Sequence, residues 1–234
     1  MTTPVPHFTE PTTHYWQQLL PADAAPAPTP PWRHGVPATL PDGRVLMLPI
    51  RQMADDPGLA VASFLCNQAS LDVVDELGRL LAERLAPLAP EVVIGLPTLG
   101  LTFAPLVARH LGHARYVPLG YSRKFWYDEA LSGAVQSITT PTGGKRVYLD
   151  PHLLSLVQGK RAVVVDDAVS SGRTLLAPWT MLESIGVQVA AVGVAMRQGN
   201  RWRDTLGPER AARVVGVFES PLLRATDEGW VPRD

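Results

Sequence analysis

Residues 163–174 read VVVDDAVSSGRT, and this stretch is the strongest indication of how the chain folds. An apolar run from Ala162 to Val165 is long enough for a short buried strand, and two adjacent carboxylates, Asp166 and Asp167, follow it directly. In an open α/β sheet, ligands bind at the carboxyl ends of the strands. The stretch therefore predicts a strand that leaves the sheet at a ligand site, with two acids at that point.

A loop of small residues and the start of a helix follow the two acids. Ser170, Ser171 and Gly172 supply backbone N–H groups and hydroxyls, and Thr174 opens a helix whose N-terminus carries partial positive charge. This end suits an anion, whereas the carboxylates suit hydroxyl groups or a hydrated Mg²⁺. A sugar phosphate meets both requirements. The alternative is an ordinary strand–loop–helix connection in which the acids form a solvated turn.

Composition limits the classes of function. The 234 residues, 46% of them hydrophobic, are enough for one substantial core and favour a single domain with a tail. A net charge of −1 with dispersed Lys and Arg gives no footprint for nucleic acid. The single cysteine, Cys66, excludes an internal disulfide, and no apolar run approaches membrane-span length, so we expect a cytoplasmic protein that is neither secreted nor inserted in a membrane.

The first 40 residues differ from the rest because prolines are concentrated there, in stretches such as PADAAPAPTPP. Proline removes backbone donors and disfavours both helix and central strand, so we interpret residues 1–40 as an extended N-terminal extension and 41–234 as the domain. Within the extension, TTHYWQQLL at 12–20 allows one or two helical turns whose aromatic and leucine side chains dock on the domain or on a second subunit. Docking on its own domain is the favoured alternative.

Strands and helices alternate after residue 40. Such alternation predicts an α/β fold with a mostly parallel sheet flanked by helices and joined by right-handed crossovers. The GG turn near residue 143 predicts an antiparallel hairpin at one edge of the sheet. The expected strands are 44–50, 92–96, 114–119, 135–139, 146–149, 161–165, 187–196 and 213–218, and the expected helices lie within 61–88 and at 101–111 and 174–185.

A second strand–loop–helix joint occurs at 92–105, VVIGLPTLGLTFAP. A doubly wound sheet brings two such loops to neighbouring strand ends, so Pro97–Thr102 and Asp166–Thr174 are expected to face one crevice. Each loop would then hold one end of a diphosphorylated sugar. Joints of this kind are also common in proteins without such a ligand. The scattered histidines and the Asp55-Asp56 pair before Pro-Gly indicate neither a metal cage nor a second catalytic pair.

The phosphate-loop motif resembles that of type I phosphoribosyltransferases, and residues 60–224 are most similar to the xanthine phosphoribosyltransferase branch, with the adenine branch next to it. Segments that carry the resemblance include VASFLCNQASLDVVDELGRLLAERL, AVQSITTPTGGKRVYLD and AMRQGNRWRDTL. The resemblance implies a type I fold with a small hood, formed by residues 41–66 and the C-terminal segment, and a homodimer. It also implies Mg²⁺-dependent transfer of ribose 5-phosphate from phosphoribosyl pyrophosphate to a purine, with release of pyrophosphate.

The resemblance implies functions for individual residues of this chain that match the family's motifs. Asp166 and Asp167 match the acids that hold the ribose hydroxyls, directly or through a water-bridged metal. The resemblance also implies a pyrophosphate loop, in which Leu99 replaces a basic residue of many members, and a mobile lid at 121–137 that excludes water. Surface packing of the lid's charged pair is the alternative. The phosphate loop comprises Ala168, Val169, Ser170, Ser171, Gly172, Arg173 and Thr174, the pyrophosphate loop Thr98, Leu99 and Gly100, and the lid cations Arg123 and Lys124.

The acceptor base is expected near Cys66, Asn67 and Arg197, where the chain departs from the xanthine branch. A guanidinium at Arg197 can donate to a purine O6 and N7 together, which favours a 6-oxopurine over adenine. The alternatives are an Arg197 paired with a surface acid and a Cys66 that only fills the core. The leading hypothesis is a purine phosphoribosyltransferase. Its rival is a non-catalytic regulatory protein that binds phosphoribosyl pyrophosphate or a nucleotide on the same fold.

Overall fold

The computed structural model describes residues 13–24, 26, 29–134 and 146–233. Its body is a parallel sheet in the order β10-β9-β8-β4-β5, and every neighbouring pair in it is parallel. The carboxyl ends of β4 and β8 are adjacent, because Gly95 pairs with Val165. The strands are β4 (Val92–Gly95), β5 (Val117–Pro118), β8 (Arg161–Val169), β9 (Gln188–Gln198) and β10 (Val214–Ser220).

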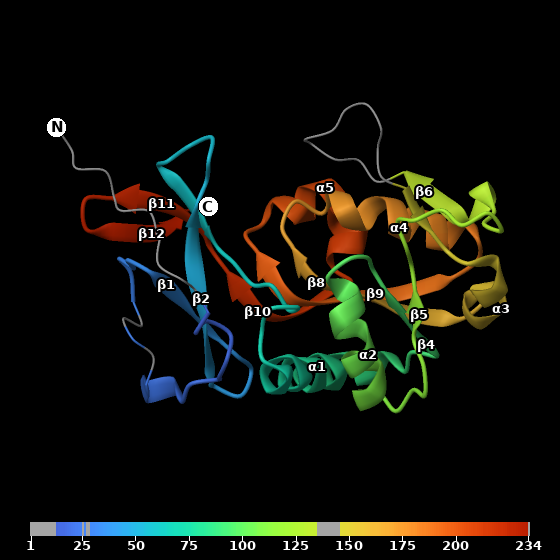
Figure 1. Cartoon of the computed structure of the whole chain (residues 1–234), viewed down its shortest axis with the longest axis horizontal. Coiled ribbons are helices and arrows are strands. Elements are labelled where there is room, and N and C mark those ends of the chain that lie inside the picture. Colours follow the sequence, from blue (N-terminus) through green and yellow to red (C-terminus); the bar gives the residue numbers. More distant parts are fainter. Residues whose placement is uncertain (1–12, 25, 27–28, 135–145, 234) are drawn as a thin grey trace.

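Helices cover both faces of this sheet (Figure 1). Helices α1 (Leu71–Leu85) and α2 (Gly100–His110) pack on one face, and α3 (Leu154–Val157), α4 (Arg173–Ser184) and α5 (Arg201–Ala211) pack on the other. The side chain of Ser70 caps α1 by accepting the N–H of Val73 at 3.2 Å. Each face thus has its own apolar cluster. Single 3₁₀ turns lie at Ala22–Ala24, Ala86–Leu88, Glu129–Leu131 and Pro151–Leu153.

A second, antiparallel sheet forms what we call the hood, with strand order β1-β2-β3-β11-β12. It draws on both ends of the described chain, and it lies beside the strand ends of the body (Figure 1). A bridge between Trp32 and Trp230, with N–H to O distances of 2.8 and 2.6 Å, joins the segment before β1 to β12. The hood strands are β1 (Gly35–Thr39), β2 (Val45–Gln52), β3 (Leu59–Ala62), β11 (Leu222–Thr226) and β12 (Gly229–Arg233).

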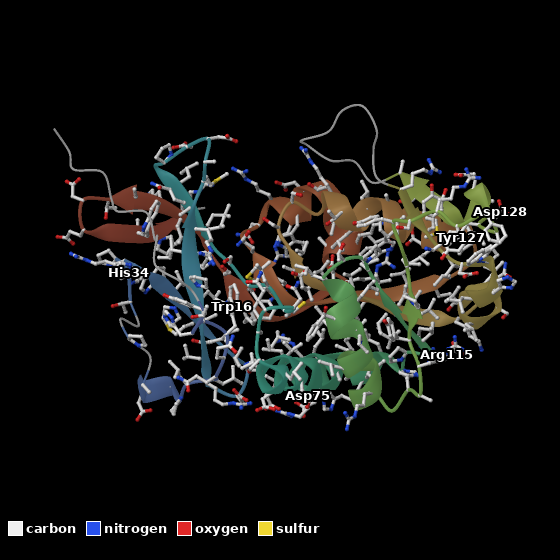
Figure 2. All side chains as sticks on the ribbon, in the orientation of Figure 1. Trp16, His34, Asp75, Arg115, Tyr127 and Asp128 are labelled. Carbon is white, nitrogen blue, oxygen red and sulfur yellow. The ribbon has the colours of Figure 1, made fainter. Side chains whose placement is uncertain are left out.

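The segment before the hood is packed against the domain of the same chain. Trp16 is 2% exposed, donates its indole N–H to the carbonyl of Ser63 at 3.2 Å and meets the ring of Phe64 edge-on. Its position beside the hood strands is visible in Figure 2. Its carbonyl also accepts the N–H of Ser70, the residue that caps α1. This segment therefore connects the hood to the first helix of the body.

A network of ion pairs joins the hood to α1. Glu76 on α1 bonds to Arg79, at 2.9 Å, and to Arg44 in the turn between β1 and β2. Hydrogen bonds from Arg79 first, and then from Arg44, lower the pKa of Glu76 to about 2 against the opposing effect of burial. The ionised form of Glu76 is thus the one that holds the hood turn against the helix.

The structure adds elements that the sequence did not predict. Residues 35–39, assigned to the extension, form strand β1, which has a neighbour only in β2, so that Pro37 lies in a strand paired on one side. Pro232 has the same position in β12. Strands β3, β11 and β12 were likewise not expected. Helix α5 was also missed: most of its residues are polar, and Gly207, with φ of 74° and ψ of 164°, is non-helical and divides it into two short helical segments.

The expected hairpin is present with shifted bounds. Strand β6 (Ser132–Ala134) pairs with β7 (Arg146–Tyr148) as a separate two-stranded sheet, and a bridge between Gly120 and Tyr148 attaches it beyond the edge strand β5. The expected strand at 135–139 lies outside the described residues. In the part of the chain that the structure describes, no helix is long and apolar enough to cross a membrane.

Candidate functional site

The two acids lie within the body, on strand β8 itself. The sequence predicted that the strand ends before them, but β8 remains paired with β9 as far as Val169. Asp166 is 8% exposed, and its carboxylate accepts the N–H of Asp167 at 3.0 Å. Burial, and then the charge of Asp167, raise the pKa of Asp166 well above its usual range. Burial also raises the pKa of Asp167. Such a pair favours a nearby cation or several hydroxyl donors.

The loop between β4 and α2 touches these acids. Gly100, the first residue of α2, lies so close that an added Cβ would be 2.7 Å from the carbonyl oxygen of Val165 and 2.9 Å from Asp166 Oδ1. The N–H of Gly100 also bonds to Asp166 and lowers its pKa, in opposition to burial. The peptide bond between Pro97 and Thr98, in the same loop, is cis. The structure therefore brings the two loops singled out in the sequence together at neighbouring strand ends.

Cys66 belongs to this cluster. Its thiol is 1% exposed and donates to the carbonyl of Leu99 at 3.1 Å. Burial first, and then the charges of Asp167 and Asp166, raise the pKa of the thiol to about 12. The thiol stays protonated at neutral pH and acts as a donor. Cys66 is thus buried as a core residue would be, but it also holds the loop that contacts the acids. Asn67 follows it in a turn and is exposed.

The phosphate-loop residues lead from β8 into α4. Gly172 has φ of 76° and occupies the N-cap position of α4, where it makes no side-chain cap. An added Cβ there would lie 3.2 Å from the Cα and carbonyl oxygen of Trp202 on α5. Both the left-handed conformation and this contact require glycine. Ser170, Arg173 and Thr174 are exposed around it. The N–H of Arg173 at the start of α4 donates to Ser171 Oγ at 3.4 Å, and that of Leu175 to the carbonyl of Gly172 at 3.2 Å. The start of a helix attracts anions, so this loop is suited to bind one beside the strand that carries the acids.

Sequence reasoning missed Tyr121 as a site residue. It follows β5, the edge strand next to β4, and burial, with the charge of Asp166 second, raises the pKa of its phenol. The phenol is therefore near enough to feel that carboxylate. The sequence feature that could have identified Tyr121 is its position directly after a strand end. In the sequence analysis Tyr121 was included in the lid at 121–137 and was not considered separately.

The proposed lid cations lie in a half-exposed segment. Arg123 pairs with Glu129 at 3.0 Å, and both side chains are about half exposed. The carbonyl of Lys124 accepts the N–H of Tyr127, and Phe125 next to it is fully exposed. Within the described residues, neither Arg123 nor Lys124 forms a hydrogen bond or an ion pair with the acids or with either loop. The last residues of the expected lid, 135–137, lie outside those described.

Arg197 lies level with the start of the phosphate loop, since it pairs with Val169 in the sheet register. Its guanidinium bonds to Glu219 at 2.6 Å, and Glu219 is mostly exposed. Its side chain packs across Gly216, where an added Cβ would lie 2.6 Å from Arg197 Cγ. This is the surface ion pair that the sequence left open as an alternative. The pair leaves other guanidinium N–H groups, and the buried Nε has no partner within the described residues.

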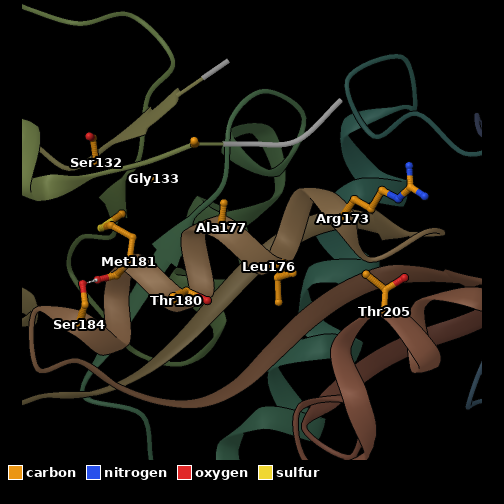
Figure 3. Close-up of a pocket in the computed structure, with 10 residues that line it drawn as sticks. Ser132, Gly133, Arg173, Leu176, Ala177, Thr180, Met181, Ser184 and Thr205 are labelled. Carbon is orange, nitrogen blue, oxygen red and sulfur yellow. Dashed lines mark hydrogen bonds between the residues drawn. The ribbon is translucent and has the colours of Figure 1, made fainter. Parts of the chain in front are cut away.

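A cavity of about 450 Å³ lies beside the phosphate loop (Figure 3). Its walls are the outer face of α4 and strand β6, and Arg173 at one end belongs to both the cavity and the loop. Figure 3 shows Arg173 extending away from the smaller side chains of α4. The cavity contains neither acid, so it adjoins the ligand site and does not coincide with it. The cavity is also lined by Leu176, Ala177, Thr180, Met181 and Ser184 of α4 and by Thr205 of α5.

Oxygen atoms of the two acids suit a hard cation. Carboxylate oxygens are the ligands that Mg²⁺ prefers, and Mg²⁺ commonly takes one or two of them together with water and substrate phosphates. Within the described ranges, no group of three or more His, Cys, Asp or Glu side chains could hold a metal ion. The donor set of Asp166 and Asp167 therefore fits an ion bound jointly with a phosphorylated ligand.

The body of the chain matches known proteins. A sequence model of the phosphoribosyl transferase domain matches residues 61–212. The xanthine phosphoribosyltransferase of Chloroflexus aurantiacus is 29% identical over 146 residues, which are 62% of this chain and 67% of that enzyme. Adenine phosphoribosyltransferase 3 of Arabidopsis thaliana is 31% identical over 122 residues, 52% of this chain and 61% of that enzyme. About a third or more of each relative therefore lies outside the alignment.

Solved structures show the same fold. The adenine phosphoribosyltransferase of Rhodothermus marinus superposes with a TM-score of 0.54 and 19% identity, over 64% of this chain and 81% of that one. At this identity the likeness supports the fold alone. The predicted α/β class, with its parallel sheet, hairpin and hood, is confirmed. Most of the hood lies outside the matched range 61–212.

Proposed function

Because the chain belongs to the phosphoribosyltransferase family, we propose that it transfers ribose 5-phosphate from phosphoribosyl pyrophosphate to a purine base and releases pyrophosphate. One observation supports this most strongly. The buried Asp166 and the half-buried Asp167 lie between the loop that ends in Gly100 and the loop that opens α4. A ligand with hydroxyls at its centre and an anion at each end is complementary to that arrangement.

The acids bind the central sugar. Their oxygens accept hydrogen bonds from the two ribose hydroxyls, and the hydroxyl protons offset part of the energy that burial of Asp166 costs. The N–H groups at the start of α4, with Ser170, Ser171 and Thr174, bind the 5-phosphate. Asp166 and Asp167 would also hold Mg²⁺, which when bound supplies positive charge to the pyrophosphate. These contacts fix the sugar carbon that reacts.

The loop from Thr98 to Gly100 binds the pyrophosphate through the backbone N–H groups of Thr98 and Leu99, since the N–H of Gly100 bonds to Asp166. The bond between the ribose C1 and the pyrophosphate oxygen breaks with its electron pair remaining on pyrophosphate, and a purine nitrogen forms the new bond to C1. Arg123 and Lys124 neutralise the departing charge. The Arg123–Glu129 pair is exposed, and such pairs contribute about 0–1 kcal/mol, so Arg123 exchanges Glu129 for pyrophosphate at low cost. The purine proton leaves to water.

We propose a 6-oxopurine as the acceptor. Arg197 lies level with the phosphate loop and keeps guanidinium donors beyond the one bonded to Glu219. Such donors complement the oxygen of a 6-oxopurine and conflict with the amino group of adenine. The relatives named above include both a xanthine and an adenine enzyme. Replacement of Arg197 by Gln is expected to reduce turnover of guanine, xanthine or hypoxanthine while leaving binding of phosphoribosyl pyrophosphate unchanged.

Pyrophosphate release from phosphoribosyl pyrophosphate and Mg²⁺, measured with a panel of purines and pyrimidines, tests the proposal. The double variant Asp166→Asn with Asp167→Asn is expected to lose turnover by about 100-fold or more. The matched control is Asp55→Asn with Asp56→Asn, an exposed adjacent pair in a turn, which should retain wild-type rates. Equal rates for both double variants would contradict the roles of Asp166 and Asp167.

The rival function predicts a different outcome of the same experiment. A non-catalytic regulatory protein would bind phosphoribosyl pyrophosphate in calorimetry but release no pyrophosphate with any base. This rival function is considered because of two features, the hood and the packed segment around Trp16. Both lie largely outside the range 61–212 that matches the family. We also propose a homodimer, for which light scattering should give twice the chain mass of 25.4 kDa.

A further inference from the structure

A second hollow lies at the opposite end of α2 from the acids. It has a volume of about 630 Å³ and is formed by the last turn of α2 and by the segment that leads into β5. We call it the α2 hollow. Arg115, on the segment between α2 and β5, is visible in Figure 2. The lining residues are Pro105, Ala108, Arg109, His113, Arg115 and Tyr116, with Ala114.

The charge of the α2 hollow has one sign. Arg109, His113 and Arg115 line it, and no acidic residue does. Within the described chain, none of these three side chains makes an ion pair or a side-chain hydrogen bond. The nearby acid on α1, Asp75, is bonded at 3.0 Å to His110, which is not part of the lining. Two guanidinium groups without counter-charges beside one cavity attract an anion, and their planar donor sets match phosphate.

The dipole of α2 does not account for this cluster. A helix C-terminus favours cations in its last turn, which explains Arg109. The carbonyls of Val107 and Ala108 already accept the N–H groups of Leu111 and His113. Arg115 lies beyond the end of the helix, outside the range over which the dipole acts. The dipole therefore accounts for Arg109 and leaves the position of Arg115 beside it to be explained.

The remaining walls suit a flat ring. Tyr116 is half-buried, and its ring packs over Gly95 of β4, where an added Cβ would lie 3.2 Å from Tyr116 Cε2. The ring is thus held in place at the edge of the hollow. Pro105 and Ala108 add apolar surface beside it. The volume exceeds the space that a phosphate needs and falls in the range of about 300–1,000 Å³ typical of small-molecule sites.

We propose that the α2 hollow binds a nucleoside phosphate, with the phosphates between Arg109 and Arg115 and the base against Tyr116. This site is separate from the acids. Gly100, which contacts Asp166, and Arg109 are the first residue and the next-to-last residue of α2, about 14 Å apart along the helix axis. A ligand in the α2 hollow is therefore not the sugar that reacts at Asp166 and Asp167.

Photolabelling of the full chain with 8-azido-ADP tests the site, with the labelled residues mapped by mass spectrometry after chymotrypsin digestion. We expect label within residues 105–116. Replacing Arg109 and Arg115 together by Gln should weaken this labelling by about tenfold for each arginine. The matched control, Arg33→Gln with Arg224→Gln, removes the same charge from exposed positions in and beside the hood and should label as the wild type does.

Three outcomes would overturn the proposal. The first is label absent from 105–116, including label confined to the phosphate loop. The second is equal labelling of this segment in the Arg109/Arg115 double variant and the wild type. The third is inorganic pyrophosphate protecting the segment as well as unmodified ADP does, which would remove the role of the base and of Tyr116. Circular dichroism of both double variants shows whether they remain folded, as surface changes should.

Discussion

Replacing Asp166 by Asn should make the ligand-free protein more stable while it abolishes turnover. Asp166 is 8% exposed; its carboxylate accepts the backbone N–H groups of Asp167 and Gly100, and its side chain also shares a hydrogen bond with that of Asp167. An amide oxygen accepts the same bonds without a charge. An unsatisfied buried polar group costs about 1–3 kcal/mol, and a charged one costs more. Taking about 2 kcal/mol, the melting temperature of a chain of this size should rise by about 4–8 °C.

The effect should depend on pH in one direction. Burial and Asp167 raise the pKa of Asp166 in the folded protein above its ordinary value of 3.8. The folded state therefore binds a proton that the unfolded state lacks between these two pKa values, and wild-type stability falls as pH rises through this window. The variant lacks this dependence. Its advantage should be full above the raised pKa and should vanish as pH falls toward 3.8.

Thermal unfolding followed by circular dichroism across this pH range measures the difference, in metal-free buffer. Asp167→Asn is the matched control, because Asp167 is less buried and should give a smaller gain. An Asp166→Asn protein that is less stable than the wild type at neutral pH would refute the reasoning. So would a gain that stays constant from neutral pH to pH 4, since the gain would then have no connection with the charge.

Three other changes test the site and its supports. Gly100→Ala places a methyl group 2.7 Å from a backbone oxygen, so we expect kcat/KM to fall at least about tenfold and stability to fall by about 1–3 kcal/mol, measured by steady-state kinetics and urea unfolding. Cys66→Ala removes the donor to Leu99 and should raise KM for phosphoribosyl pyrophosphate severalfold, whereas Cys66→Ser should restore it; equal KM values would contradict a positioning role. Glu76→Gln should lose about 0.5–1 kcal/mol at pH 7, less in high salt. Because the pKa of Glu76 is lowered to about 2, this contribution is present above pH 4.5 and lost as pH falls through about 2, and acid titration of both proteins should show their stabilities converge.

The parallel sheet could be predicted because its strands have distinct sequence patterns. The apolar run before Asp166 and the Gly-containing loop after Val92–Gly95 both mark strand–loop–helix units, and these patterns depend only on neighbouring residues. The hood could not be predicted in the same detail. Its strands β1 and β12 contain Pro37 and Pro232, which argue against strand when pairing is unknown. Which strands lie at an edge is decided by tertiary pairing and not by local sequence.

In the candidate site, too, the residues marked by local sequence could be predicted, whereas those placed by tertiary contacts could not. Asp166 and the loop from Ser170 to Thr174 could be named from their order in the chain. The effect of Asp166 on the pKa of Tyr121, and the bond from Cys66 to Leu99, depend on how segments far apart in sequence lie in space. Arg197 was identified at the right strand end, but only the structure shows that Glu219 already bonds to it.

The hood has a consequence for the order of folding during synthesis. Strand β3 ends at Ala62, and its partner β11 begins only at Leu222, after every strand of the body. A ribosome releases the chain from its N-terminus, so the body can fold while β3 still lacks that partner. Until β11 and β12 emerge, the nascent chain exposes an open strand edge of the kind that pairs with other chains and aggregates. Nonsense mutations shortly before residue 222 should therefore yield a folded body that precipitates, whatever its active-site residues are.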